Sequence, residues 1–164
     1  MPWIKPVKQK DIKDLGVYEQ LDQPVSIFHR LMAHTPELLE SFTPLQQAVK
    51  QVTIGDQTRE IIITYVSVLN GCEYCTKGHK TVLGTMIDQK EVESLLADDI
   101  RLFDPSIQAI LNYAKKLVVD RASLSKGDIE ELTNLGFSTK EIVEINHVVA
   151  YTSYTNQLSI GLGL

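Results

Sequence analysis

Helix start signals recur along the sequence and leave little room for a β-sheet. Asp104-Pro105 pairs an N-cap residue with a proline at the first helical position. Ser138 and Glu141 have the spacing of a capping box, in which two side chains satisfy free backbone groups at a helix start. No pair of strands joined by a turn is evident. The pattern predicts an all-α fold, a single-domain bundle of about six to eight helices.

One segment favours a strand by local propensity. The run from Ile61 to Val66 is rich in β-branched residues and would suit a buried strand. However, Asp56 is a good N-cap before this run, and no helix breaker occurs between Thr58 and Leu69. Because buried strands usually end after about four to eight residues, the length of this stretch favours a helix.

The chain is expected to consist of an N-terminal arm, residues 1–35, and a helical domain, residues 36–164. Residues 1–23 are polar, contain prolines and a glycine, and are typical of irregular or extended chain. The helical domain is expected to begin at Thr35-Pro36, another N-cap and proline pair. The expected helices cover residues 36–42 with a restart at 44, 56–69, 72–86, 88–98, 105–121, 125–135 and 138–158.

The composition argues against several kinds of partner. The chain has a net charge of −5, whereas nucleic-acid binding needs a clustered basic face, so such binding is not expected. No run of about 18 apolar residues is present, so no membrane span is expected. The first residues lack the basic stretch and apolar run of a secretory signal, and two cysteines do not make a secreted disulfide framework. We therefore expect a cytoplasmic protein.

The segment from Cys72 to His79 carries the chemistry. Cys72, Cys75 and His79 share one face of a helix, because they are spaced about one turn apart. The amino end of a helix favours the thiolate, which is the reactive form of cysteine. His79 can accept or return the Cys75 proton, and the two sulfurs can close a disulfide with little movement. The sequence predicts a redox-active thiol pair, and no nucleotide or flavin fingerprint indicates a bound cofactor.

The preceding helix adds a carboxylate to this group. Glu60, Thr64 and Ser67 form a polar stripe on an otherwise apolar helix, and the stripe ends near Asn70, just before the cysteines. Because burying a lone carboxylate is costly, Glu60 needs a partner, and His79 is the expected one. The alternative is a glutamate that stabilises the helix N-terminus and faces solvent.

Other polar side chains are secondary candidates. Those expected to line the pocket lie near the cysteines or on the last helix: Tyr74, Ser67, His147 and Tyr151. For His147, a core position with a satisfied hydrogen bond is favoured over a position in the pocket. His29 and His34 lie upstream of the motif and are expected at the surface or at an interface.

Two other functions use the same residues. Cys72, Cys75 and His79 are good zinc ligands, although no second Cys/His pair supplies the fourth ligand of a structural site. The chain would then be a zinc-stabilised or purely oligomeric interaction module. A thioredoxin-like disulfide reductase would instead need the Ile-rich run as a strand and a cis-proline loop after the motif. The only later proline, Pro105, lies at a predicted helix start.

The spacing of Glu60, Cys72, Cys75 and His79 resembles that of the alkyl hydroperoxidase D family, within the carboxymuconolactone decarboxylase-like superfamily. The resemblance covers residues 36–162 and includes positions around the motif and in the last helix, namely Asn70, Tyr74, residues 139–143, residues 148–150 and Asn156. It implies an all-helical protomer that assembles into trimers or hexamers.

The resemblance also implies roles for the four residues. By matching position, Cys75 is the attacking sulfur, Cys72 resolves the intermediate, and Glu60 and His79 form a proton relay in the reduction of hydroperoxides or disulfides. An external dithiol or a peroxiredoxin-type partner protein would reduce the Cys72–Cys75 disulfide. Tyr74 is a departure, because the best-studied hydroperoxidase-type members carry a histidine there. The lactone decarboxylases of the superfamily lack the cysteine pair, so decarboxylation is not expected.

Overall fold

The computed structural model describes residues 2–164, and within them all regular structure is helical: nine α-helices and two 3-10 turns. The expected all-α class is confirmed. Spatial clustering divides the chain into two compact units. The N-terminal unit comprises Met1–Gln51 with Ser159–Leu164, and the second unit comprises Val52–Leu158. Met1, the first residue of the expected arm, lies outside the described residues.

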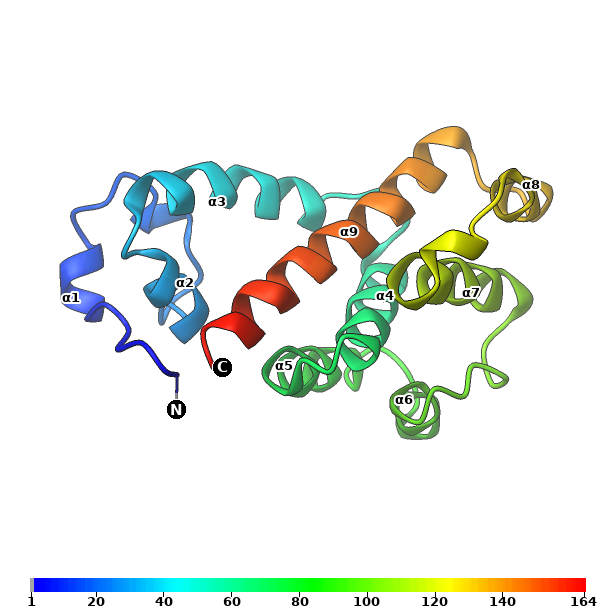
Figure 1. Cartoon of the computed structure of the whole chain (residues 1–164), viewed down its shortest axis with the longest axis horizontal. Coiled ribbons are helices and arrows are strands. Elements are labelled where there is room, and N and C mark those ends of the chain that lie inside the picture. The colour runs from blue at the N-terminus through cyan, green and yellow to red at the C-terminus, as the bar shows by residue number, and fades with distance from the viewer. Residues whose placement is uncertain (1) are drawn as a thin grey trace. The chain divides into compact units, whose positions relative to one another are not determined.

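The N-terminal unit is folded where an irregular arm was expected. Its elements are α1 (Gln9–Ile12), a 3-10 turn (Tyr18–Gln20), α2 (Ile27–Met32) and α3 (Pro36–Lys50) (Figure 1). Buried apolar side chains from both halves of the expected arm form its core, among them Ile12, Val17, Leu21, Val25, Phe28 and Leu31. The boundary at residue 35 is not observed, because α3 clusters with the residues before it.

Helix α3 continues through Pro44, where we expected a break and restart. The proline removes one backbone hydrogen bond. Leu39, Phe42 and Val49 nevertheless form one buried face of the helix. Burial of this face keeps the segment helical on both sides of the proline.

The two ends of the described chain meet within the N-terminal unit. The backbone N–H of Trp3 donates to the carbonyl of Leu162 at 3.0 Å. Gly163 has a φ of +75° and lies against the indole of Trp3, where a Cβ atom would be 2.6 Å from the ring. Only glycine fits this position, because both the backbone angle and the space exclude a side chain.

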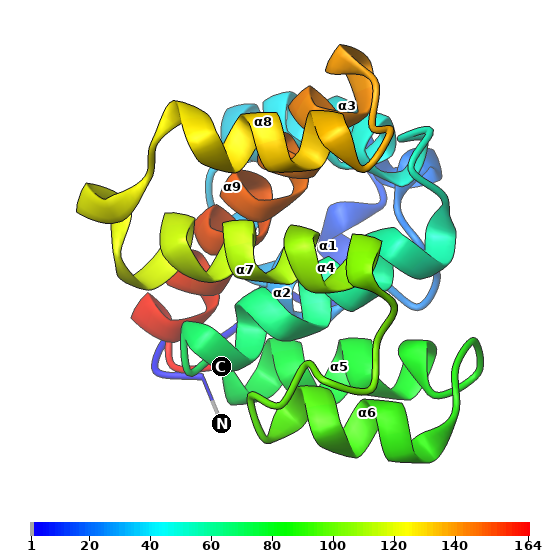
Figure 2. The same cartoon turned by 90° about the vertical axis from the view of Figure 1, so that its right-hand side faces the viewer.

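The second unit contains the remaining helices. They are α4 (Asp56–Leu69), α5 (Glu73–Leu83), α6 (Gln89–Leu96), α7 (Pro105–Val119), α8 (Lys126–Asn134) and α9 (Thr139–Gly161), of which α9 belongs to this unit up to Leu158. Helix α4 contacts α5, α6 and α7, and α8 packs on α7 (Figure 2). A helix that contacts three neighbours is apolar on most sides, so α4 is the centre of this unit.

The central position of α4 explains its β-branched sequence. Ile61, Ile62 and Val66 are each at most 1% exposed, and the whole run is helical. β-branched residues suit any crowded buried surface, and here the neighbouring helices supply that surface. The thioredoxin-like alternative required a strand at this place and is therefore wrong.

The predicted start signals are largely confirmed. The Asp104 carboxylate accepts hydrogen bonds from two backbone N–H groups of the first turn of α7. Ser138 and Glu141 form the capping box of α9. Asp56 differs, because it is the first residue of α4 and Gly55, with a φ of +88°, occupies the N-cap position. No helix among residues 2–164 is long and apolar enough to cross a membrane.

Candidate active site

A tight turn between α4 and α5 places the first cysteine. Gly71 has a φ of +69°, and its backbone N–H donates to the carbonyl of Val68 at 3.0 Å. The backbone N–H of Cys72 donates to the carbonyl of Ser67 at 3.0 Å. These two bonds form a Schellman motif, which ends α4 and needs a residue that tolerates positive φ. Asn70-Gly71 therefore fixes where α5 starts.

Cys72 is the N-cap of α5, and Cys75 lies in its first turn. The Sγ atom of Cys72 accepts a hydrogen bond from the backbone N–H of Cys75 at 3.4 Å. The two sulfurs are joined as a disulfide, with Cα atoms 5.4 Å apart. Cys72 is 1% and Cys75 is 9% exposed, so access to the disulfide is through Cys75. The pair occupies the end of the helix that stabilises negative charge on sulfur.

Glu60 and His79 are hydrogen-bonded to one another across α4 and α5. The Glu60 side chain is 8% exposed, and its Oε2 atom lies 2.8 Å from Nδ1 of His79. The solvent-facing alternative for Glu60 is therefore wrong. The His79 ring is 39% exposed and follows Cys75 by one turn of α5. Since the carboxylate accepts from Nδ1, Nε2 is the ring nitrogen left to exchange a proton.

The Arg59 guanidinium lies beside the other oxygen of the Glu60 carboxylate. The guanidinium of Arg59 lies 3.6 Å from Oε1 of Glu60 and donates to Asp56 at 2.7 Å. Arg59 and His79 together offset the cost of burying the carboxylate.

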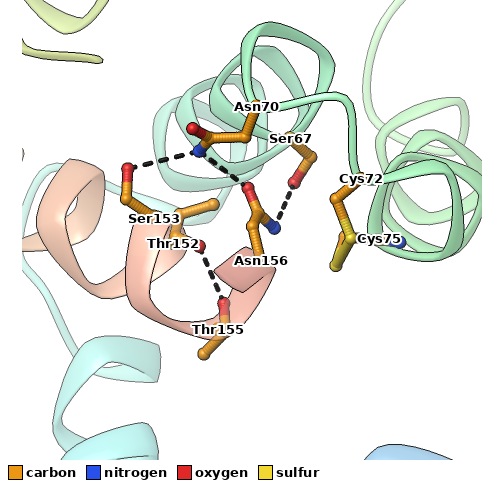
Figure 3. The surroundings of a disulfide bond; sticks show 8 residues. All are labelled: Ser67, Asn70, Cys72, Cys75, Thr152, Ser153, Thr155 and Asn156. Atoms are coloured by element: carbon orange, nitrogen blue, oxygen red, sulfur yellow. Dashed lines mark hydrogen bonds between the residues drawn. A yellow bond between two sulfur atoms is a disulfide. The ribbon is translucent and has the colours of Figure 1, made fainter. Parts of the chain in front are cut away.

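Helix α9 completes the surroundings of the disulfide. Asn156 is fully buried, and its amide donates to the hydroxyl of Ser67 at 3.2 Å. The amide of Asn70 donates to Asn156 at 3.0 Å and to the Ser153 hydroxyl at 3.3 Å. Figure 3 shows this network beside Cys72 and Cys75. The network holds the end of α4, from which the turn to the cysteines begins.

The structure places the secondary candidates differently. Ser67 is fully buried and belongs to the Asn156 network, and Tyr74 and Tyr151 are partly exposed. His147 is exposed, so its expected core position is wrong. The buried face of α9 follows Ile145, Val148 and Thr152, and residue 147 lies off that face.

The upstream histidines also differ from one another. His34 is exposed, as expected. His29 is 6% exposed and is hydrogen-bonded through both ring nitrogens, so its expected surface position is wrong. Sequence reasoning did not assign a site role to Asn156, because its partners on α4 are more than 80 residues away.

The geometry bears on metal binding as well. Among residues 2–164, no three His, Cys, Asp or Glu side chains converge as a metal site requires. Cys72 and Cys75 bond to each other. Thiolate ligands would become available only after reduction.

A sequence profile described as the carboxymuconolactone decarboxylase family matches residues 36–116. Among curated proteins, no sequence matches the chain at a significant level.

Solved structures provide matches over nearly the whole chain. An uncharacterized peroxidase-related protein from Silicibacter sp. TM1040 is 22% identical, with a TM-score of 0.82 over 98% of this chain and 86% of that chain. The alkylhydroperoxidase AhpD core protein from Ralstonia eutropha JMP134, also peroxidase-related, is 18% identical, with a TM-score of 0.81 over 99% and 90%. The debrominase Bmp8 is 18% identical, with a TM-score of 0.83 over 98% and 89%. At these identities the matches establish the fold. The profile match and the fold together support an alkyl hydroperoxidase D-like member of the carboxymuconolactone decarboxylase superfamily.

Proposed function

We propose that this chain is a thiol–disulfide redox enzyme that reduces hydroperoxides or disulfides through Cys72 and Cys75. The observation that carries the proposal is the 2.8 Å hydrogen bond between His79 and the buried Glu60, one helical turn from Cys75. A sulfur that changes oxidation state needs a nearby route for its proton, and a carboxylate–imidazole pair provides one. The peroxidase-related names of two proteins with this fold agree with the proposal.

In the proposed cycle Cys75 attacks and Cys72 resolves. Cys75 is the more exposed sulfur and the one that His79 follows by one turn. His79 accepts the Cys75 proton at Nε2, and Glu60 orients the ring and stabilises the imidazolium that forms.

The steps balance without a bound cofactor. The Cys75 thiolate attacks the outer oxygen of a hydroperoxide, the O–O bond breaks, and the leaving alkoxide takes the proton held by His79. The products are an alcohol and a sulfenic acid on Cys75. The Cys72 thiol then attacks this sulfur, forms the disulfide and releases water. With a disulfide substrate, Cys75 forms a mixed disulfide and a thiol leaves instead.

Regeneration takes two electrons from outside the chain. An external dithiol, small or carried by a partner protein, attacks the Cys72–Cys75 disulfide and leaves as a disulfide itself.

Tyr74 bears on which substrate is preferred. It precedes Cys75 and carries a phenol in place of an imidazole. His79 is then the proton carrier of the site. An alkoxide leaving group needs that proton more than a thiolate does, because a thiolate is a much weaker base. Loss of the relay should therefore reduce hydroperoxide turnover more than disulfide turnover.

A substrate panel with two matched cysteine variants tests the proposal. The full chain is incubated with dithiothreitol and, separately, with hydrogen peroxide, cumene hydroperoxide, a small disulfide and a brominated pyrrole. We expect consumption of a hydroperoxide or disulfide that depends on the dithiol. Cys75→Ser should abolish turnover, whereas Cys72→Ser should retain the first attack on substrate and lose the cycle.

Three outcomes would overturn the proposal. Turnover that Cys75→Ser leaves unchanged would remove the cysteine from the chemistry. Stoichiometric zinc in chelator-free protein, with both thiols protected from alkylation, would indicate a zinc-stabilised module. A protein of this fold, a Bmp8 variant, was crystallised with 2,3,4-tribromopyrrole. Consumption of the pyrrole alone would therefore replace the proposal with thiol-dependent dehalogenation.

A further inference from the structure

One buried hydroxyl on the polar stripe of α4 has no use in the cycle above. Thr64 is fully buried, and within residues 2–164 its Oγ1 is the buried side-chain nitrogen or oxygen atom that lacks a hydrogen-bond partner. Buried polar groups in folded proteins nearly always have a partner. An unpartnered buried hydroxyl on the helix that leads to the cysteines therefore indicates a partner that is absent when Cys72 and Cys75 form a disulfide.

Other buried threonines in the same chain satisfy their hydroxyls within their own helix. Thr43 donates to the carbonyl of Leu39 at 2.8 Å, and Thr152 donates to the carbonyl of Val148 at 2.7 Å. This bond, to the residue four positions back, is available to any threonine in a helix. The Thr64 hydroxyl does not make it. Its orientation is therefore not set by the helix backbone.

The register between α4 and α5 places Thr64 at the level of Cys75. The two helices are consecutive and antiparallel, with Glu60 bonded to His79 at one end and the Ser67 carbonyl bonded to the Cys72 N–H at the other. Thr64 lies one turn after Glu60 on α4. Cys75 lies one turn before His79 on α5. The two residues thus occupy the same level between the two observed contacts.

We propose that the Thr64 hydroxyl donates a hydrogen bond to the sulfur of Cys75 when the disulfide is reduced. The proposal rests on the redox cycling of Cys72 and Cys75 put forward above. The structure holds the disulfide, and in this state the Thr64 hydroxyl makes no hydrogen bond to either sulfur. Reduction creates a thiolate, and a hydrogen bond to an ionised acceptor is stronger than one to a neutral acceptor.

The hydroxyl would act beside the titratable and charged groups that the two helices carry near Cys75. On α4 and α5 these are Glu60 and His79, with Arg59 beside the carboxylate. The α9 side chains drawn next to the disulfide in Figure 3 are neutral. A neutral donor stabilises the thiolate without adding a charge to a buried site. It therefore favours the reduced form of the pair and lowers the pKa of the Cys75 thiol.

The test is the thiol–disulfide equilibrium of the full chain in glutathione redox buffers, read by alkylation and mass spectrometry. Thr64→Val keeps the shape of the side chain and removes the donor, whereas Thr64→Ser keeps the donor. Thr152→Val is the matched control, since its hydroxyl bonds to its own helix. We expect Thr64→Val to shift the equilibrium about tenfold toward the disulfide, which is a potential about 30 mV lower. Thr64→Ser and Thr152→Val should remain near wild type.

Two results would overturn the assignment. One is a Thr64→Val equilibrium equal to that of wild type, and the other is an equal shift in Thr152→Val, which would reveal a packing effect. If Thr64→Val does not fold, Thr64→Ala provides the same comparison, with far-ultraviolet circular dichroism as the check. The equilibrium is measured without substrate. Failure of the substrate panel and failure of this assignment are therefore separate observations.

Discussion

The two units of the molecule use a histidine in opposite ways. In the N-terminal unit, His29 is 6% exposed, and its ring nitrogens bond to the Ser26 hydroxyl at 2.9 Å and to Gln46 at 3.0 Å. The centroid of the Phe42 ring lies 6.1 Å from the centroid of the His29 ring. In the second unit, His79 is 39% exposed and bonds to a buried carboxylate. The His29 imidazole has neutral partners at both ring nitrogens, whereas the His79 imidazole has a carboxylate at one ring nitrogen.

This difference separates a structural histidine from one that can move protons. Burial lowers the pKa of His29, although the hydrogen bond that its Nε2 donates to the Gln46 amide oxygen acts in the other direction. A neutral ring with both nitrogens bonded has no route for proton exchange. His79 has one nitrogen bonded to Glu60, and in the proposed cycle the other nitrogen exchanges the proton of Cys75. Both residues are histidines, and the partner of the second ring nitrogen decides the role of each.

Removing the second-unit histidine should have the largest effect. We expect His79→Asn to reduce hydroperoxide turnover about 100-fold, because a positioned acid–base group contributes at least that much. Since the asparagine amide can still donate to the buried Glu60 carboxylate, the unfolding midpoint in urea should change little. Steady-state kinetics and urea unfolding of the same preparation measure both quantities. Unchanged turnover would show that His79 is as structural as His29, and the comparison would fail.

Removing the N-terminal histidine should produce the reverse result. His29→Ala leaves a cavity and two side chains without their partner, so we expect a loss of about 2–3 kcal/mol in the free energy of unfolding. Urea unfolding followed by far-ultraviolet circular dichroism measures this loss, because all regular structure in residues 2–164 is helical. The glutathione equilibrium of Cys72 and Cys75 should stay at the wild-type value. A shift in that equilibrium would contradict the proposed separation of roles.

A carboxylate in the second unit tests whether burial alone makes a group catalytic. Asp128 is 8% exposed and accepts from the N–H and hydroxyl of Ser125 at 2.8 and 3.1 Å, with Lys116 bonded to its other oxygen. The hydrogen bond from Lys116 is the main cause that holds the pKa of Asp128 below its ordinary value. We expect Asp128→Asn to cost about 1 kcal/mol of stability, as for a lost helix cap, and to leave turnover unchanged.

The pH dependence gives the control for Asp128. A carboxylate with a lowered folded pKa stabilises the fold above its ordinary value of 3.8, and that contribution is lost as the pH falls through the folded pKa. The stability gap between wild type and Asp128→Asn should therefore close in acid. A stability difference between the two proteins that persists at low pH would mean that the charge of Asp128 does not cause it.

The smallest expected effect is the titration of His29. Its pKa is below 6.5, mainly because the ring is buried, so the neutral form is the folded form. The stability that this provides is complete above pH 6.5 and falls as the pH drops through the folded pKa. Urea unfolding followed by far-ultraviolet circular dichroism should show this loss in wild type as the pH drops below 6.5. His29→Ala should show none of it, and an identical pH dependence in both would exclude the histidine.

Local spacing was enough to predict the core of the site. Cys72, Cys75 and His79 lie within two helical turns, and Glu60 begins a stripe that the helix period defines. Their meeting follows from helix geometry and one turn at Gly71. The helical state of the Ile-rich run was also predictable from its length, against the propensity of its residues.

Contacts between distant residues, and elements of only one turn, could not be predicted from local spacing. Asn156 reaches Ser67 across 89 residues, and no local pattern links them. In the N-terminal unit, the buried residues Val17, Leu21 and Val25 are spread across a one-turn 3-10 element and Pro24. No helical period can be recognised there. His147 was misplaced for a related reason, since a single helix does not reveal which of its faces will be covered.

The contact between Trp3 and Gly163 has a practical consequence for protein engineering. Both ends of the described chain are held side by side in the N-terminal unit by the bond from Trp3 to Leu162. A short peptide could therefore join them, and new termini could be opened elsewhere, as in a circular permutant. Bulky fusions at both ends would compete for the same small area of surface. An affinity tag is best attached through a flexible spacer at one end only.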